Sequence, residues 1–262
     1  MRKLLLSITL FILFLSGCSN PSTDTTSPTN TQQTIVNSIF SDSKTDFKIN
    51  VFYEASAAPY VGLIGLSGNQ TWDITKSSYT AFFQNHSNRT VTVPTTLGQM
   101  TSRPDQGKTT WTSSELIQFA NSSAVALNNG TQININVFFV KGNFEGNVNI
   151  LGIQFTGYPY AFVFKDIVTS TGGDSVSQRY VEQATVVHEI GHAVGLVNNG
   201  LSMVANHEDA SHSHHTSNTN CIMYWAVESK SSILTSIANL ITGNQLNLFG
   251  AQSLQDGRSY HP

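Results

Sequence analysis

Residues 175–196 read SVSQRYVEQATVVHEIGHAVGL, and this stretch carries the strongest helical pattern in the chain. Its apolar side chains recur at three- and four-residue spacing, which is the spacing of one helix face. They are Val176, Tyr180, Val181, Ala184, Val187 and Val194. Turn residues at 172–175 precede the stretch, and Gly195 stands near its end, where a glycine with positive φ can turn the chain. The pattern therefore predicts one long helix over residues 175–196.

Residues 188–192 of this helix read HEIGH, a match to the pattern H-E-x-x-H. His188 and His192 lie one turn apart, so both imidazoles project from one helix face, with Cβ atoms about 5–6 Å apart. Two imidazoles in this position can bind one tetrahedral Zn²⁺. Glu189 lies beside them and can take a proton from water that zinc activates, then pass it to a leaving amine. The motif predicts His188 and His192 as zinc ligands and Glu189 as the catalytic base and acid.

Two features outside the five-residue motif extend the match. Gly195 follows His192 at the spacing H-x-x-G, and Met223 follows downstream in the segment Cys221-Ile222-Met223. Together, residues 185–225 resemble the metzincin metallopeptidases, whose signature is H-E-x-x-H-x-x-G-x-x-H followed by a methionine turn. The resemblance implies a zinc-dependent endopeptidase that acts on a peptide or protein substrate. It also implies that Met223 packs beneath the zinc ion without binding it.

The third zinc ligand is where the chain departs from that signature. The metzincin histidine would fall at residue 198, which is asparagine, a poor zinc ligand. The segment that follows offers four candidates: His207, His212, His214 and His215. Residues 215–223, HTSNTNCIM, resemble the archaemetzincin pattern H-C-x4-C-x-M in spacing, with Thr216 in place of the first cysteine. This resemblance favours His215, and His207, His212 and His214 stay open as alternatives.

The first 45 residues predict export and anchoring. Two basic residues and the apolar run Leu4–Leu15 precede LSGC at 15–18. The run is too short to span a bilayer, and LSGC resembles the lipobox of bacterial lipoproteins. We expect a signal peptide at 1–17, a lipidated Cys18 and a flexible tether over 18–45, since residues 19–33 hold no aliphatic or aromatic side chain. The metallopeptidase domain then spans 46–262 and lies in the cell envelope, extracytoplasmic and held to a membrane by its lipid alone.

Composition sets limits on the partners. Of the 262 residues, 39% are hydrophobic, enough to build a core, whereas only 11% are charged, against about 25% in an average domain. The net charge of -3 excludes the basic surface that nucleic-acid binding needs. We expect a monomer without a nucleic-acid partner. With Cys18 lipidated, Cys221 has no second cysteine with which to form a disulfide.

Alternating and helical patterns elsewhere predict the remaining elements. Strands are predicted at 47–54, 91–93, 133–140, 149–155 and 160–164. Helices are predicted at 71–84, from 113 to the sequence Asn128-Asn129-Gly130, at 233–241 and at 246–254. Strands before a long helix predict an α/β (α+β) fold with an irregular C-terminal half and closing helices. The metzincin resemblance implies a twisted mixed sheet, with the substrate paired as an extended strand against residues 146–153.

Two other functions fit the same residues. A non-catalytic binding lipoprotein would keep the zinc ion as a structural element, and its metal would have a closed shell of four protein ligands. An envelope metal-capture protein would use the histidine-rich segment 207–215, since such tracts bind metals readily. It would bind more than one metal ion per chain and would not depend on Glu189.

Overall fold

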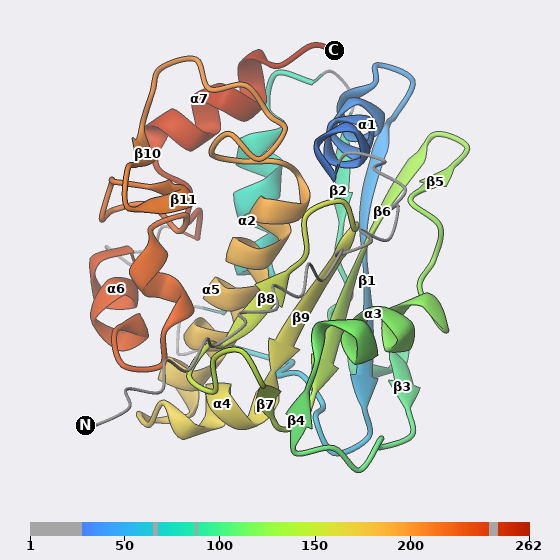
Figure 1. Ribbon diagram of the computed structural model, residues 1–262, viewed down its shortest axis with the longest axis vertical. Helices are drawn as coiled ribbons and strands as arrows, with labels where there is room; N and C mark the ends of the chain where they lie inside the picture. Colours follow the sequence, from blue (N-terminus) through green and yellow to red (C-terminus); the bar gives the residue numbers. More distant parts are fainter. Residues whose placement is uncertain (1–27, 65–67, 87–88, 241–245) are drawn as a thin grey trace, which may run out of the picture.

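The computed structural model describes residues 28–262 except 65–67, 87–88 and 241–245 (Figure 1). In this part of the chain, seven strands form one mixed sheet with the order β2-β1-β6-β9-β8; β3 also pairs with β1, and β5 with β6. β1 runs parallel to β2, β3 and β6, and β6 runs parallel to β9, whereas β8 is antiparallel to β9. The strands are β1 (Asp46–Glu54), β2 (Thr90–Thr92), β3 (Thr101–Arg103), β5 (Asn128–Asn129), β6 (Gln132–Val140), β8 (Gly152–Gln154) and β9 (Tyr160–Phe164). The predicted α/β class with a mixed sheet is confirmed.

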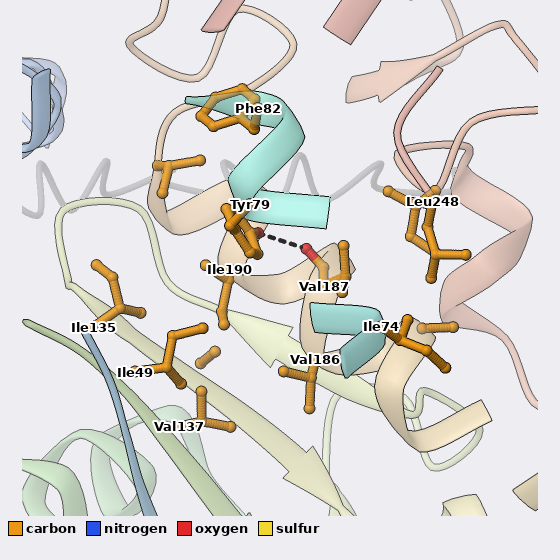
Figure 2. Packing of buried hydrophobic residues seen from close by; sticks show 14 of the residues in the cluster. Ile49, Ile74, Tyr79, Phe82, Ile135, Val137, Val186, Val187, Ile190 and Leu248 are labelled. Carbon is orange, nitrogen blue, oxygen red and sulfur yellow. Dashed lines mark hydrogen bonds between the residues drawn. The ribbon is translucent and has the colours of Figure 1, made fainter. Parts of the chain in front are cut away.

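The sheet has a hydrophobic layer on each face because its central strands alternate two sets of apolar residues. On one face, Ile135 and Val137 of β6 join the large core cluster under α2 (Asp73–Phe82) and α5 (Ser175–Ala193). Figure 2 shows these residues near Val186 and Ile190 of α5, and Tyr79 donates a hydrogen bond of 2.8 Å to the carbonyl of Val187. On the other face, β6 packs in a smaller cluster with α3 (Ser113–Asn121). The sheet thus supports α5 along a buried face.

Helix α5 begins at the predicted residue and ends at Ala193, three residues before the predicted end. The side chain of Asp174 accepts a hydrogen bond from the backbone N–H of Ser177, which caps the first turn. At the other end, Gly195 adopts φ +90° and donates to the carbonyl of His192, while Leu196 donates to the carbonyl of Gly191. This pair of bonds is a Schellman motif, which ends the helix at Ala193, directly after His192.

The predicted flexible tether is wrong for its second half. Helix α1 spans Pro28–Phe40, and its side chains Ile35, Val36, Ile39 and Phe40 lie in the large core cluster. Gln32 is also buried, and its amide donates to the carbonyls of His192 and Ala193. Apolar residues after position 34 supply the buried side chains of this helix, so the folded domain begins before residue 46. The predicted signal peptide, Cys18 and the start of the tether lie outside the described residues.

Three other predicted boundaries differ from the observed ones. The helix from 113 ends at Asn121, since the buried amides of Asn134 and Asn136 bind the backbone of residues 125 and 126. The strand at 149–155 shortens to β8. The helix predicted at 246–254 begins only at Ala251, because Leu248 is extended and its carbonyl accepts from Ile222 N–H.

The C-terminal half is irregular with closing helices, as expected. It contains α6 (Ile233–Leu240) and α7 (Ala251–Ser259), the short strands β10 (Glu208–Asp209) and β11 (His212–Thr216), and the 3-10 helix η2 (Trp225–Glu228). The remaining elements are α4 (Lys165–Ser170), η1 (Leu97–Gln99), and the paired strands β4 (Thr110–Trp111) and β7 (Asn143–Phe144). Among the described residues, none of the helices combines the length and hydropathy needed to span a bilayer.

Candidate metal centre

Helix α5 delivers the first two candidate ligands from its last turns. His188 and His192 are both buried, and their Nε2 atoms lie 3.0 Å apart. They face the same side because four residues are close to one helical turn. Gly191 lies between them, and a Cβ atom there would fall 2.4 Å from Sδ of Met223. The helix therefore packs directly on the methionine turn.

Strand β11 brings the third imidazole. Nε2 of His215 lies 2.9 Å from Oε1 of Glu228, the same oxygen that lies 3.2 Å from Nε2 of His188. The four possible ligand atoms of His188, His192, His215 and Glu228 all lie within 4.8 Å of one another. We call these four residues the metal cluster.

The ring orientations fit metal binding. Nδ1 of His188 lies 2.7 Å from the carbonyl of Ile222, and Nδ1 of His215 lies 3.0 Å from the carbonyl of Ser213. A carbonyl only accepts, so each Nδ1 carries a hydrogen and each Nε2 turns its lone pair toward the cluster when the ring is neutral. Lone pairs at 3.0 Å from one another, beside a carboxylate, repel unless a proton or a metal ion lies between them. Three imidazoles and a carboxylate are a ligand set that suits Zn²⁺.

Glu228 is the site residue that sequence reasoning missed. It ends η2, five residues after Met223, and its side chain is 32% exposed. Besides its contacts with His188 and His215, its Oε1 atom lies 3.6 Å from Nε2 of His192. An acidic residue close behind the CIM segment was the only available signal, and the metzincin signature assigns no role to that position.

The pKa values of the two carboxylates at this site are shifted in opposite directions. Burial raises the pKa of Glu189 well above its usual value, and the charge of Glu228 raises it further. Burial also acts to raise the pKa of Glu228, but hydrogen bonds from His188, His192 and His215 outweigh it and hold that pKa below the ordinary range. Without a metal ion, the environment therefore favours the ionised form of Glu228 and the protonated form of Glu189. A cation bound in the cluster would favour the charged form of Glu189.

The pKa values of two of the imidazoles, His192 and His215, are also shifted in opposite directions. Burial lowers the pKa of His192 to about 3, so this ring is neutral at physiological pH. Burial would also lower the pKa of His215, but its hydrogen bond and charge interaction with Glu228 raise it above the ordinary value. Metal ligands must be deprotonated, so a metal ion entering the cluster displaces protons that Glu228 attracts.

Glu189 lies beside the cluster without joining it. Its side chain is buried, and Oε1 has no hydrogen-bond partner among the described residues. The edge strand β8 lies directly over it, because a Cβ atom at Gly152 would fall 2.8 Å from Cγ of Glu189. A cleft of about 250 Å³ between β8 and β11 is lined by Glu189, His192 and Glu228 among others. An unpaired buried carboxylate oxygen at such a cleft is available to a water molecule or a substrate.

The other candidate histidines have different partners. His207 is buried, with Nε2 at 2.8 Å from Asp256 and Nδ1 at 2.9 Å from the hydroxyl of Thr216. We call these three residues the His207 network. The ring of His212 stacks on Trp225 with centroids 4.3 Å apart. The side chain of His214 is 40% exposed.

Two further positions complete the comparison with the sequence. Asn198, at the place of the metzincin histidine, donates its side-chain amide to Glu208. Cys221 and Met223 are both buried in the large core cluster, and Cys221 lies 3.3 Å from the hydroxyl of Ser253. The structure thus brings His215, and not His207, His212 or His214, to the two histidines of α5. Metal binding by these residues stays a prediction.

Comparison with known proteins finds a slight structural likeness. The crystal structure of archaemetzincin from Archaeoglobus fulgidus, complexed with malonate, is similar to this chain with a TM-score of 0.41 and 16% sequence identity. The match covers 80% of this chain and 99% of that chain. No family model matches the sequence, and a search of the curated proteins finds no match.

Proposed function

We propose that this protein is a zinc-dependent endopeptidase. The observation that carries the proposal is the convergence of three imidazole Nε2 atoms beside the buried carboxylate of Glu189, whose Oε1 has no hydrogen-bond partner among the described residues. His188, His192 and His215 are the ligands, and Met223 supports the helix from below. The metzincin resemblance of residues 185–225 supports the same assignment independently of the side-chain geometry.

Each residue has a part in hydrolysis. A bound zinc ion supplies Lewis acidity, which lowers the pKa of water and polarises a carbonyl oxygen. Glu189 accepts the proton of the attacking water at its carboxylate and later delivers it to the leaving amine. The raised pKa of Glu189 suits the delivery step, because it favours the protonated carboxyl group that gives the proton to the amine.

The substrate is proposed to bind as an extended peptide along β8. This strand ends the sheet order and pairs with β9 on one side, and no described strand pairs with its other side. Figure 1 shows β8 lying beside α5, which carries Glu189. Backbone pairing with such an edge is tolerant of sequence, so side-chain contacts in the cleft would set the specificity. The proposed substrate strand corrects the predicted one, since residues 146–151 precede β8.

The cellular setting is proposed from the sequence alone. The lipobox-like tetrapeptide at 15–18 supports lipid attachment at Cys18 and a place in the cell envelope, with the enzyme acting as a monomer on extracytoplasmic peptides or proteins. Labelled fatty acid incorporated by the wild-type chain and not by Cys18→Ser would support the anchor. Equal incorporation by both would contradict it.

A second candidate function is favoured by Glu228. Its carboxylate supplies a fourth ligand atom, and a closed shell of four protein ligands is typical of structural zinc. On that hypothesis the protein is a non-catalytic binding lipoprotein. The metal-capture hypothesis has less support, because the histidines of the 207–215 segment have separate partners and the described residues hold no second group of ligands.

Digestion of a mixed peptide library by the zinc-loaded full chain tests the proposal. The matched variant is Glu189→Gln, which keeps the size of the side chain and removes its basicity. We expect cleavage by the wild type, a fall of about 10²- to 10⁴-fold in the variant, and one zinc ion per chain in both. One zinc ion per chain with cleavage by neither protein would favour the structural-zinc hypothesis.

A further inference from the structure

The segment that carries Glu228 is paired with the chain just before β8. Leu151 N–H donates to the carbonyl of Glu228 at 3.0 Å, and Lys230 N–H donates to the carbonyl of Asn149 at 3.0 Å. Between them, Ile150 and Ser229 form an antiparallel bridge. Residues 149–151, which directly precede β8, therefore already have a backbone partner. We call residues 228–230 the Glu228 arm.

The Glu228 arm is held in place on its other side as well. Its preceding residues Ala226 and Val227 are buried, and the hydroxyl of Ser232 donates to the carbonyl of Ala226 at 2.6 Å. Trp225 stacks on His212 with an interplanar angle of 7°. The backbone of Glu228 is thus fixed by packing and by hydrogen bonds, so the position of its carboxylate over the imidazoles follows from the fold.

The side chain of Glu228 differs from the imidazoles in its access to solvent. It is 32% exposed, whereas the side chains of His188 and His192 are 1% and 9% exposed. A molecule that enters from solvent therefore meets Glu228 before it meets those ligands. Oε1 of Glu228 lies within 3.6 Å of Nε2 of all three imidazoles, whereas Oε1 of Glu189 has no hydrogen-bond partner among the described residues, so the two carboxylates have different parts.

We propose that Glu228 is a fourth, protein-derived ligand of the metal ion and that the Glu228 arm closes the site until a substrate displaces it. The inference rests on the proposed function and adds a means of regulation to it. Opening exchanges one oxygen donor for another, the Glu228 carboxylate for a substrate carbonyl or a water molecule, and changes no covalent bond. The same arm lies along residues 149–151, so a long peptide that extends past β8 competes with its backbone pairing as well.

Cobalt(II) loading of the full chain tests this ligand role without relying on turnover. Its visible spectrum reports the number and type of ligands, and titration with acetohydroxamate reports how easily an outside ligand enters. The test variants are Glu228→Gln, which removes the charge at constant size, and Glu228→Asp, which keeps the charge but shortens its reach. Glu208→Gln is the matched control, because Glu208 is a neighbouring carboxylate whose contacts are with Asn198 and His214.

For Glu228→Gln we expect a changed cobalt spectrum and metal binding weaker by about 10- to 100-fold. Acetohydroxamate should bind at least about 10-fold more tightly, since the protein no longer has to open first. Cleavage of a peptide at saturating metal should become faster. Glu228→Asp should resemble Glu228→Gln, because reach and not charge is lost, and Glu208→Gln should resemble the wild type.

The failures are distinguishable. An unchanged spectrum and unchanged acetohydroxamate affinity in Glu228→Gln would overturn the ligand role and leave the peptidase proposal intact. The expected spectral changes without cleavage by any of the proteins would support the ligand role and overturn the peptidase. No metal ion bound by the wild type would overturn both.

Discussion

Two histidine clusters lie in the same half of this molecule and use their ring nitrogens in opposite ways. In the His207 network, both nitrogens of His207 have complementary partners, and Asp256 also accepts from Val204 N–H at 2.7 Å. In the metal cluster, the Nε2 atoms of His188 and His192 face each other at 3.0 Å with a carboxylate beside them. The first arrangement is complete without a ligand, whereas the second needs a proton or a metal ion between its nitrogen atoms.

The difference shows how a ligand can be told from a structural histidine. His207 and His215 are close in sequence and both are largely buried, so burial does not separate them. The hydrogen-bond partners of the ring nitrogens do separate them. In His215, a carbonyl on Nδ1 leaves the lone pair of Nε2 free for a metal ion, whereas in His207 the Nε2 atom is already bonded to Asp256.

The largest expected effect is on metal affinity. His215→Ala should weaken zinc binding by about 10²- to 10³-fold, because binding energies of about 10–16 kcal/mol are shared by four ligands. His214→Ala is the control, since that side chain is exposed and outside the cluster. Competition with a chelator of known affinity measures both. Similar losses in the two variants would mean that His214 reaches the metal and that the described cluster is not the binding site.

The next effect is on stability and concerns the other cluster. His207→Ala should lower the free energy of unfolding of the metal-free protein by about 2–3 kcal/mol, because Asp256 loses a buried partner. His215→Ala should change that free energy far less. Urea denaturation in the presence of a chelator measures the difference. If the His207→Ala protein folds but binds zinc as weakly as His215→Ala, then His207 also contributes to metal binding, and the two clusters do not have separate functions.

A smaller effect tests how the metal cluster is supported from below. Gly191→Ala places a methyl group 2.4 Å from Sδ of the buried Met223, so we expect a loss of about 1–2 kcal/mol in spite of the better helix propensity of alanine. In a double-mutant cycle, Met223→Ala should relieve part of that loss and give a coupling of about 1 kcal/mol. Additive losses would show that the helix does not rest on Met223 at this point.

The sequence was most informative where one pattern repeats over many residues. Alternation predicted β6 and helical spacing predicted α5, and both were confirmed to within a few residues because burial of those elements is strong enough to be visible locally. Helix α1 was missed because its buried residues follow a polar, proline-containing stretch. Glu228 could not be predicted, since its part depends on a pairing between residues 149–151 and 228–230 that no local pattern encodes.

The smallest expected effect extends the comparison to His86, a buried histidine that belongs to neither cluster. Burial lowers its pKa, and Arg89 and His261 lower it further, against the opposing effects of the Gly257 carbonyl and Asp42. The unfolded chain therefore takes up a proton near pH 6.5 that the folded chain does not, so stability from this group is full above that pH and falls as the pH decreases below it. His86→Gln keeps a donor for Gly257 but cannot titrate.

Urea denaturation of the metal-free proteins at pH 7.5 and pH 5 measures this difference. The variant should lose less stability than the wild type on acidification, with the other titrating groups common to both proteins. The partners of a histidine decide whether it acts as a metal ligand, a structural residue or a pH-sensitive residue. His86 is the third case, because one ring nitrogen is bonded to a carbonyl and the other is buried without a hydrogen-bond partner among the described residues. Equal losses in the two proteins would mean that the ring titrates normally, and would place His86 with the exposed histidines.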